Sequence, residues 1–117
     1  MPQALPSSQV QDVVLWLLRR RRRFRVRGNS MLPALKPGDE VLIDPAAYRQ
    51  RSPQPGELVI AQHPHQPHLR MIKRVHWVAP DGACDLRGDN PSESSDSRTF
   101  GLVDPQLILG RVLCTFP

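Results

Sequence analysis

Proline and glycine pairs divide this chain into short segments and so limit the folds open to it. Pro37-Gly38 and Pro55-Gly56 each stand just before a short apolar run, at residues 40–43 and 58–61. Such pairs favour turns, and short apolar runs bounded by turns are typical of strands. Further runs of this kind occupy residues 24–26, 70–78, 84–87 and 107–113. We therefore predict a mainly β protein with a compact antiparallel fold.

One helix is expected before the strands. Ser8 followed by Gln11 resembles a capping box, and apolar residues then recur at helical spacing through Leu18. This predicts a short amphipathic helix over residues 9–19, far below the ~20 apolar residues needed to cross a bilayer. Two placements stay open. The apolar stripe packs on the domain, or it lies on a membrane surface with Trp16 at the interface and the following arginines on phosphates.

The positive charge of the chain is concentrated beside this helix. Seven of the 16 basic residues lie between positions 19 and 27, and the remainder of the chain is close to neutral. A chain of 117 residues matches one domain, so we assign residues 1–23 to the helix and arginine run and residues 24–117 to one folded unit. Aromatic residues make up only 5% of the chain, which disfavours a base-stacking surface, and no nucleic acid is expected.

The cysteines and histidines do not predict a metal site. Cys84 and Cys114 lack metal-ligand spacing and are expected to be reduced and packed. Prolines separate His63, His65 and His68, which indicates a solvated hairpin tip, so no metal or other cofactor is expected. Positive charges follow the N-terminal apolar stretch instead of preceding it, unlike a cleavable signal peptide, and this favours the cytoplasm.

Ser30 and Lys73 are the candidate catalytic residues. A serine hydroxyl is a weak nucleophile until a neighbouring group takes its proton, and a neutral amine can do so. Strand alternation places Lys73 on the same face as Met71 and Val75. An apolar environment can lower a lysine pKa from about 10.4 by up to about 3 to 5 units. We therefore expect Ser30 as the nucleophile and Lys73 as its base.

Four segments, in order along the chain, resemble the signal-peptidase-like serine proteases that use a Ser/Lys dyad. They are the nucleophile motif Ser-Met-x-Pro at 30–33, the base-bearing strand at 72–75, the box Gly-Asp-Asn-x-x-x-Ser-x-Asp-Ser-Arg at 88–98, and a closing Gly-x-Val at 110–112. The likeness covers about residues 24–112. It implies a serine endopeptidase with the antiparallel β fold that signal peptidases share with repressor-type proteases.

The resemblance also implies an oxyanion hole in the turn formed by Gly28, Asn29 and Ser30. The Ser30 backbone N–H would contribute to it, and such a donor is worth roughly 3 kcal/mol. Many relatives add a serine hydroxyl two residues before the nucleophile. Gly28 stands at that position here, so this side-chain donor is missing.

Roles around the dyad follow from the same likeness. Ser94 would hydrogen-bond near the lysine, Asp96 and Arg98 would pair to brace the site, and Asp89 and Asn90 would fix the loop. Read without the family, these residues indicate only a polar turn. The candidates for the wall of the substrate cleft, with ordinary core packing as the alternative, are Phe24, Val26 and Met31.

The protein substrate is predicted from the resemblance alone. The run 30–42 is most similar to the group that matures nickel-type superoxide dismutase, which implies removal of a short propeptide from that precursor. The alternative is a type I signal peptidase that processes secretory precursors at the membrane surface, with the short helix in place of the usual tether. A self-cleaving repressor is disfavoured because only 23 residues precede Phe24. A phosphate- or nucleic-acid-binding module with an inactive dyad is the remaining reading.

Overall fold

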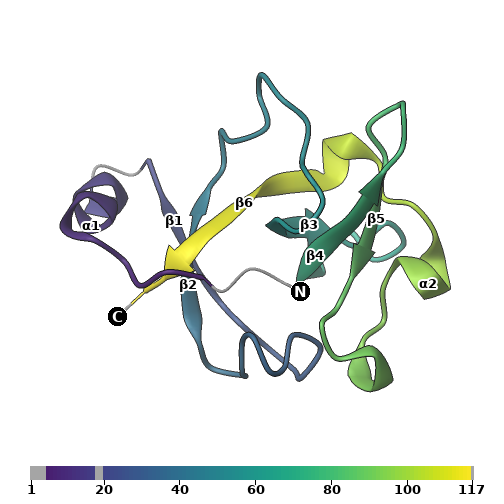
Figure 1. Ribbon diagram of the computed structural model, residues 1–117, viewed down its shortest axis with the longest axis horizontal. Coiled ribbons are helices and arrows are strands. Elements are labelled where there is room, and N and C mark those ends of the chain that lie inside the picture. The colour runs from purple at the N-terminus through teal and green to yellow at the C-terminus, as the bar shows by residue number, and fades with distance from the viewer. Residues whose placement is uncertain (1–4, 18–19, 117) are drawn as a thin grey trace.

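One antiparallel sheet forms the body of the protein (Figure 1). The computed structural model describes residues 5–17 and 20–116. The strands follow the spatial order β1-β2-β6-β3-β4-β5. Their bounds are β1 Arg22–Arg25, β2 Glu40–Asp44, β3 Leu58–Gln62, β4 Arg70–Val78, β5 Cys84–Arg87 and β6 Ile108–Thr115. The predicted mainly β antiparallel fold is confirmed.

The strand bounds agree closely with the sequence pattern, except at the first and last strands. β4 and β5 have the predicted bounds, and β2 and β3 each extend one residue further. β1 starts at Arg22 instead of Phe24, because its arginines pair with the apolar strand β2, where Arg22 lies opposite Ile43. Tertiary pairing thus overrides the low strand preference of a charged run. β6 starts one residue later than predicted, since Leu107 ends a 3-10 turn.

Alternation along the strands divides the core into two clusters. Side chains of successive strand residues point to opposite faces of a sheet. One cluster contains Val41, Ile43, Leu58, Ile60 and Ile72. The other contains Val59, Ala61, Met71, Val75 and Leu86. Met71 and Val75 therefore share a face of β4, as predicted, and Lys73 lies between them.

Three short helical turns lie in the connection between β5 and β6. They are η1 Pro91–Glu93, α2 Ser97–Phe100 and η2 Pro105–Leu107. The Asp96 side chain begins α2 by accepting from the Arg98 backbone N–H. Cys84 and Cys114 are free and buried. Burial raises the pKa of the Cys84 thiol to about 11, so this thiol stays neutral.

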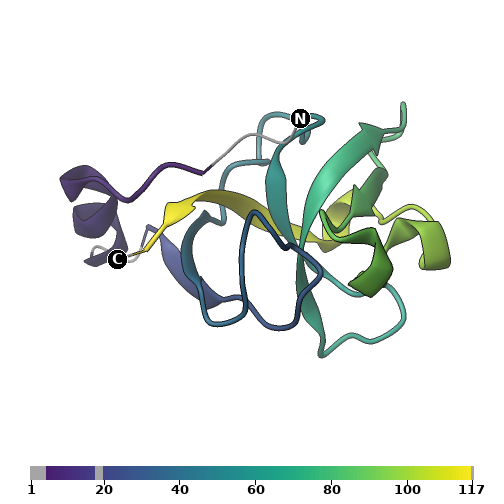
Figure 2. The same cartoon turned by 60° about the horizontal axis from the view of Figure 1, so that its bottom comes forward.

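The N-terminal helix α1 (Val10–Leu17) lies at the opposite end of the molecule from α2 (Figure 1, Figure 2). The Trp16 ring meets the Phe116 ring edge-on, with 5.0 Å between centroids. However, Val10, Val14 and Leu17 stay 82%, 46% and 66% exposed. The expectation that the apolar stripe packs on the domain is therefore wrong for these residues, because the helix contacts the domain through Trp16. Leu18 lies outside the described residues.

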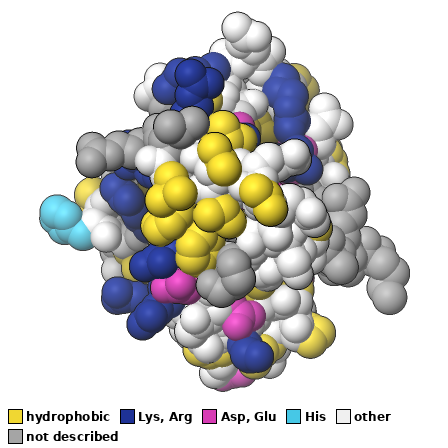
Figure 3. Space-filling view, turned by 90° about the vertical axis from the view of Figure 1, so that its left-hand side faces the viewer, with side chains coloured by type: hydrophobic (Ala, Val, Ile, Leu, Met, Phe, Trp, Pro, Cys, Tyr) yellow, Lys and Arg dark blue, Asp and Glu magenta, His cyan; other side chains and the backbone are white. Residues whose placement is uncertain are grey.

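No helix in the described ranges is long and apolar enough to span a membrane. The exposed stripe of α1 instead belongs to one face of the molecule on which apolar side chains gather, with Lys and Arg side chains around them (Figure 3). Basic side chains border the apolar patch, so this face is both apolar and positively charged.

Candidate active site

Ser30 is held in a turn that leaves β1. Gly28 enters this turn with φ of 71°, a conformation that glycine adopts at no steric cost. The next residue after the serine, Met31, is fully buried and its carbonyl accepts from the Leu35 N–H at 3.0 Å. The Ser30 N–H donates no hydrogen bond within the described part of the chain. That donor is therefore free to meet a developing oxyanion.

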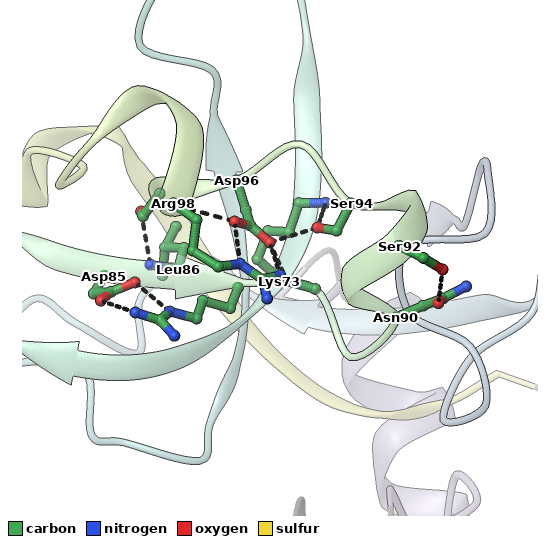
Figure 4. Close-up of polar contacts among 11 residues, drawn as sticks. Lys73, Asp85, Leu86, Asn90, Ser92, Ser94, Asp96 and Arg98 are labelled. Atoms are coloured by element: carbon green, nitrogen blue, oxygen red, sulfur yellow. Dashed lines mark hydrogen bonds and ion pairs between the residues drawn. The ribbon is translucent and has the colours of Figure 1, made fainter.

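Lys73 lies in the middle of β4 and is only 5% exposed. Its Nζ donates to Ser94 Oγ at 3.2 Å (Figure 4). Burial lowers the pKa of Lys73; the negative charge of Asp96 opposes this shift, and the positive charge of Arg98 adds to it. Loss of solvent thus increases the neutral fraction of this amine, as a general base requires.

Ser30 and Lys73 face the same space. Both line a cleft of about 460 Å³ and an adjoining one of about 290 Å³. No hydrogen bond joins the two side chains among the described residues, since the Lys73 amine is bonded to Ser94. Catalytic hydrogen bonds are often absent or long before substrate binds.

Asp96 fixes the direction in which Ser94 bonds (Figure 4). The carboxylate is fully buried and accepts from the Ser94 hydroxyl at 2.6 Å and from Arg98 Nη2 at 2.6 Å. Burial acts to raise the pKa of Asp96, but hydrogen bonds from Arg98, Ser94 and the Gly88 N–H lower it well below its usual range. Because the Ser94 proton goes to Asp96, only its oxygen lone pairs face Lys73. Ser94 therefore holds one N–H of the amine.

The loop that begins at Gly88 braces the nucleophile turn. The Asn90 N–H donates to the Ser30 carbonyl at 2.8 Å, and Asn90 Nδ2 donates to the Asn29 carbonyl at 3.0 Å. A Cβ on Gly88 would lie 2.6 Å from the Ser30 carbonyl oxygen and would also collide with Ser94. Only glycine fits between the turn and the group that holds the lysine, so the two halves of the site are in direct contact.

Arg74 is a site residue that the sequence reasoning missed. It follows Lys73 on β4, and its guanidinium donates to both oxygens of Asp89, at 3.0 and 2.9 Å. A further bond of 2.9 Å reaches the Gly56 carbonyl, and Arg74 is 7% exposed. This buried pair ties the loop to the strand that carries the lysine. An arginine directly beside the predicted base, together with an aspartate in the box, was the available signal.

The structure places the three predicted cleft residues differently. Phe24 lines the larger cleft. Val26 and Met31 are 2% and 0% exposed and belong to the core, so core packing is the correct reading for these two. Among the described residues that line the two clefts, neither Val26 nor Met31 occurs.

His63 corrects the expectation of a fully solvated hairpin tip. It is 7% exposed and packs on the Phe100 ring, with 4.7 Å between centroids. Its Nδ1 accepts from the His65 N–H at 3.0 Å. Burial lowers the pKa of His63, and His65 and Lys73 lower it further. The described residues contain no group of three side chains able to hold a metal ion.

The antiparallel sheet thus places Ser30 and a desolvated Lys73 on one cleft. A profile of the signal peptidase family, peptidase S26, matches residues 13–84. The chain therefore belongs to the signal peptidase family, peptidase S26.

Individual relatives fit this assignment. The chain is 33% identical over 108 residues to the mitochondrial ATP-independent inner membrane protease subunit 1b of Arabidopsis thaliana, with 74% of this chain and 64% of that protein covered. It is 31% identical to the mitochondrial inner membrane protease subunit 1 of Xenopus tropicalis, covering 73% and 62%. It is 23% identical to the probable signal peptidase I-1 of Synechocystis, covering 78% and 68%. The chain thus spans less than two thirds of the length of the first two of these relatives.

Proposed function

We propose that this chain is an endopeptidase that cuts precursor proteins, with Ser30 as nucleophile and Lys73 as general base. The observation that carries the proposal is the environment of the Lys73 amine. It is buried on the cleft that Ser30 also lines, and burial lowers its pKa. Ser94, fixed as an acceptor by Asp96, occupies one N–H and leaves the lone pair of a neutral amine free to turn toward the serine.

The chemistry follows from these positions. The neutral Lys73 Nζ takes the proton from Ser30 Oγ, and Oγ attacks the scissile carbonyl carbon. The oxygen of the tetrahedral intermediate accepts from the Ser30 N–H. The Lys73 ammonium then protonates the leaving amine, and an ester to Ser30 remains. Lys73 next takes a proton from water, whose oxygen attacks the ester and releases the acid and Ser30.

The substrate would bind as an extended strand. β1 is the edge of the sheet, and β5 pairs with β4 only from Arg74 onward, so no strand of the described chain pairs with residues 70–73 on that side. The larger cleft is lined by both β1 and this open part of β4. Backbone groups on a free edge can pair with an added peptide strand. Such a peptide would pass the Ser30 hydroxyl as it lies in the cleft.

The relatives of the chain favour precursors handled at a membrane. They are protease subunits of the mitochondrial inner membrane and a probable signal peptidase. The exposed apolar stripe of α1 beside the arginines supports a peripheral position on an anionic membrane surface, on the cytoplasmic side (Figure 3). The main substrates we propose are therefore secretory or membrane-protein precursors.

The nickel superoxide dismutase precursor is a second candidate substrate. Its support is the similarity of residues 30–42 to the group that matures that enzyme. No residue of the cleft selects between the two kinds of precursor. The support for this substrate therefore comes from the sequence motif alone.

One parallel experiment tests the function and separates the substrates. Purified protein is incubated, with and without anionic vesicles, with a secretory precursor and with the nickel superoxide dismutase precursor, and product masses are read. Ser30→Ala is the control. A single Ser30-dependent cut supports the peptidase and identifies its substrate. Cleavage that survives Ser30→Ala, or no cleavage of either precursor under any condition, contradicts the proposal.

A further inference from the structure

We infer that the cleft selects a substrate segment with acidic side chains at every second position, recognised by arginines of the β1 wall and by Arg70. This inference rests on the proposed peptidase function and adds a chemical class of substrate to it. It starts from the charges around the cleft. Four cationic side chains line the larger cleft, all of them arginines: Arg23, Arg25, Arg27 and Arg70. No aspartate or glutamate among the described residues lines it.

The arginines of this wall are short of anionic partners. Arg23 and Arg25 share the single carboxylate of Glu40, at 3.7 and 3.5 Å, and their side chains are 45% and 67% exposed. Arg27 and Arg70 are exposed and form no ion pair in the described part of the chain. One carboxylate cannot balance four guanidiniums. A concave surface lined by one sign of charge concentrates the opposite charge from solution.

The spacing of the arginines matches an extended peptide. Along residues 23–27, exposed side chains alternate with partly buried or buried ones, Phe24 and Val26. Arg23 and Arg25 therefore share one face of β1, about 7 Å apart, because a strand rises about 3.4 Å per residue. Arg27 follows just beyond the end of this strand and lines the same cleft. A peptide paired with this edge has the same repeat. Its alternate side chains lie beside these arginines on the same face of the sheet.

Carboxylates are the side chains that these arginines fit. A guanidinium presents paired N–H donors to the two oxygens of a carboxylate, and such charge-assisted bonds fix orientation as well as adding affinity. Exposed pairs of this kind are weak, so each is expected to change substrate affinity by about two- to fivefold. Selection would come from several positions acting together and would fall as the salt concentration rises.

The test compares Asp with Asn, one position at a time, in peptides spanning the cleavage site that the wild-type protein cuts. Asp should lower KM about two- to fivefold at alternate positions on one side of the cut, with kcat nearly unchanged. Arg25→Gln and Arg27→Gln should each remove the gain at one position. Arg49→Gln is the matched control, since Arg49 is exposed and does not line the cleft. Arg27→Glu should reverse the preference at its position from Asp to Lys.

Each outcome is decisive. Equal cleavage of Asp and Asn peptides at every position overturns the acidic preference and leaves the peptidase function standing. A gain from Asp that persists in Arg25→Gln and Arg27→Gln, or that Arg49→Gln removes equally, also overturns it. So does a result in which these variants lose only binding to anionic vesicles, because the arginines would then serve lipid. If nothing is cleaved, binding of fluorescent Asp and Asn peptides to Ser30→Ala decides the inference alone.

Discussion

The two walls of the cleft treat charge in opposite ways. On the wall formed by β4 and the loop after Gly88, the Lys73 amine is bonded to Ser94. Ser94 is bonded in turn to the carboxylate of Asp96, which is fully buried and also paired with Arg98. On the wall formed by β1, exposed arginines share Glu40 or have no anionic partner in the described ranges. A buried charge needs fixed partners, whereas an exposed one does not. One wall is therefore suited to hold catalytic groups still, and the other to receive a ligand.

Replacing the amine of Lys73, on the wall formed by β4, should have the largest effect on activity. Lys73→Met keeps much of the side-chain volume and removes the base, so kcat should fall at least about 1,000-fold. The free energy of unfolding should not decrease, because a buried amine is replaced by an apolar group. Single-turnover kinetics and urea denaturation measure the two effects. Substantial activity in a folded Lys73→Met protein would exclude the lysine as the base.

Removing the bonds of Asp96 to Arg98 and Ser94 should lower the free energy of unfolding. In Asp96→Asn the fully buried carboxylate loses its charge-assisted bonds to Arg98 and Ser94, and we expect a loss of about 2–3 kcal/mol. Asp85→Asn is the matched control. Its partner Arg87 also lies two residues away and bonds both oxygens, but the Asp85 side chain is 16% exposed whereas that of Asp96 is fully buried, so the loss should stay below about 1 kcal/mol.

The pH dependence of the stability of Asp96→Asn distinguishes a loss of charge from a loss of packing. The pKa of Asp96 lies well below its ordinary value of 3.8, so its stabilisation is present above that pH and is lost as the pH falls through the folded-state pKa. The stability gap between wild type and Asp96→Asn should therefore narrow in strong acid. Denaturation series at several pH values measure it; a gap that does not change with pH would indicate packing instead of charge.

The pH dependence of kcat should report the amine. The neutral form of Lys73 is active, so activity should rise with pH along a limb whose pKa lies below the ordinary lysine value of 10.5. Asp96 raises this pKa and Arg98 lowers it. The limb should therefore move to lower pH in Asp96→Asn and to higher pH in Arg98→Gln. Shifts in the same direction in both variants would contradict this electrostatic account.

The smallest effect on stability is expected for the exposed arginines on the wall formed by β1. Arg25→Gln removes an exposed side chain whose ion pair with Glu40 is 3.5 Å long. The free energy of unfolding should change by less than about 0.5 kcal/mol. Thermal or urea denaturation of this variant beside Asp96→Asn would sharpen the contrast between the walls. A loss as large as that of Asp96→Asn would show that the arginines of β1 are structural.

The sequence predicted what depends on local pattern. Turn pairs and apolar runs identified the strands, and the neighbours Met71 and Val75 indicated the apolar setting of Lys73. What it missed depends on contacts between distant segments. His63 is buried because Phe100, far along the chain, covers its ring. Arg74 acquires its role from Asp89 on the neighbouring loop. The first strand extends into the arginines because β2 offers them a partner.

The fit between Gly88, Ser94 and Ser30 also had no local signal. Glycine in a polar loop usually indicates a turn, but Gly88 does not adopt a positive φ. Glycine is required at position 88 because the Ser30 carbonyl approaches so closely that no room is left for a Cβ. Close approach of two segments is a property of the assembled fold, so single-sequence reasoning had no access to it.

The arginines of β1 have a further consequence for self-association. A strand at the edge of a sheet presents unpaired backbone groups, which can pair with the same edge of another copy of the chain and lead to aggregates. If two β1 edges met, arginines would face arginines across the seam, and like charges directly opposite one another destabilise such pairing. Charge repulsion thus disfavours pairing of this edge with the same edge of another copy, while the edge stays open to strands of opposite charge.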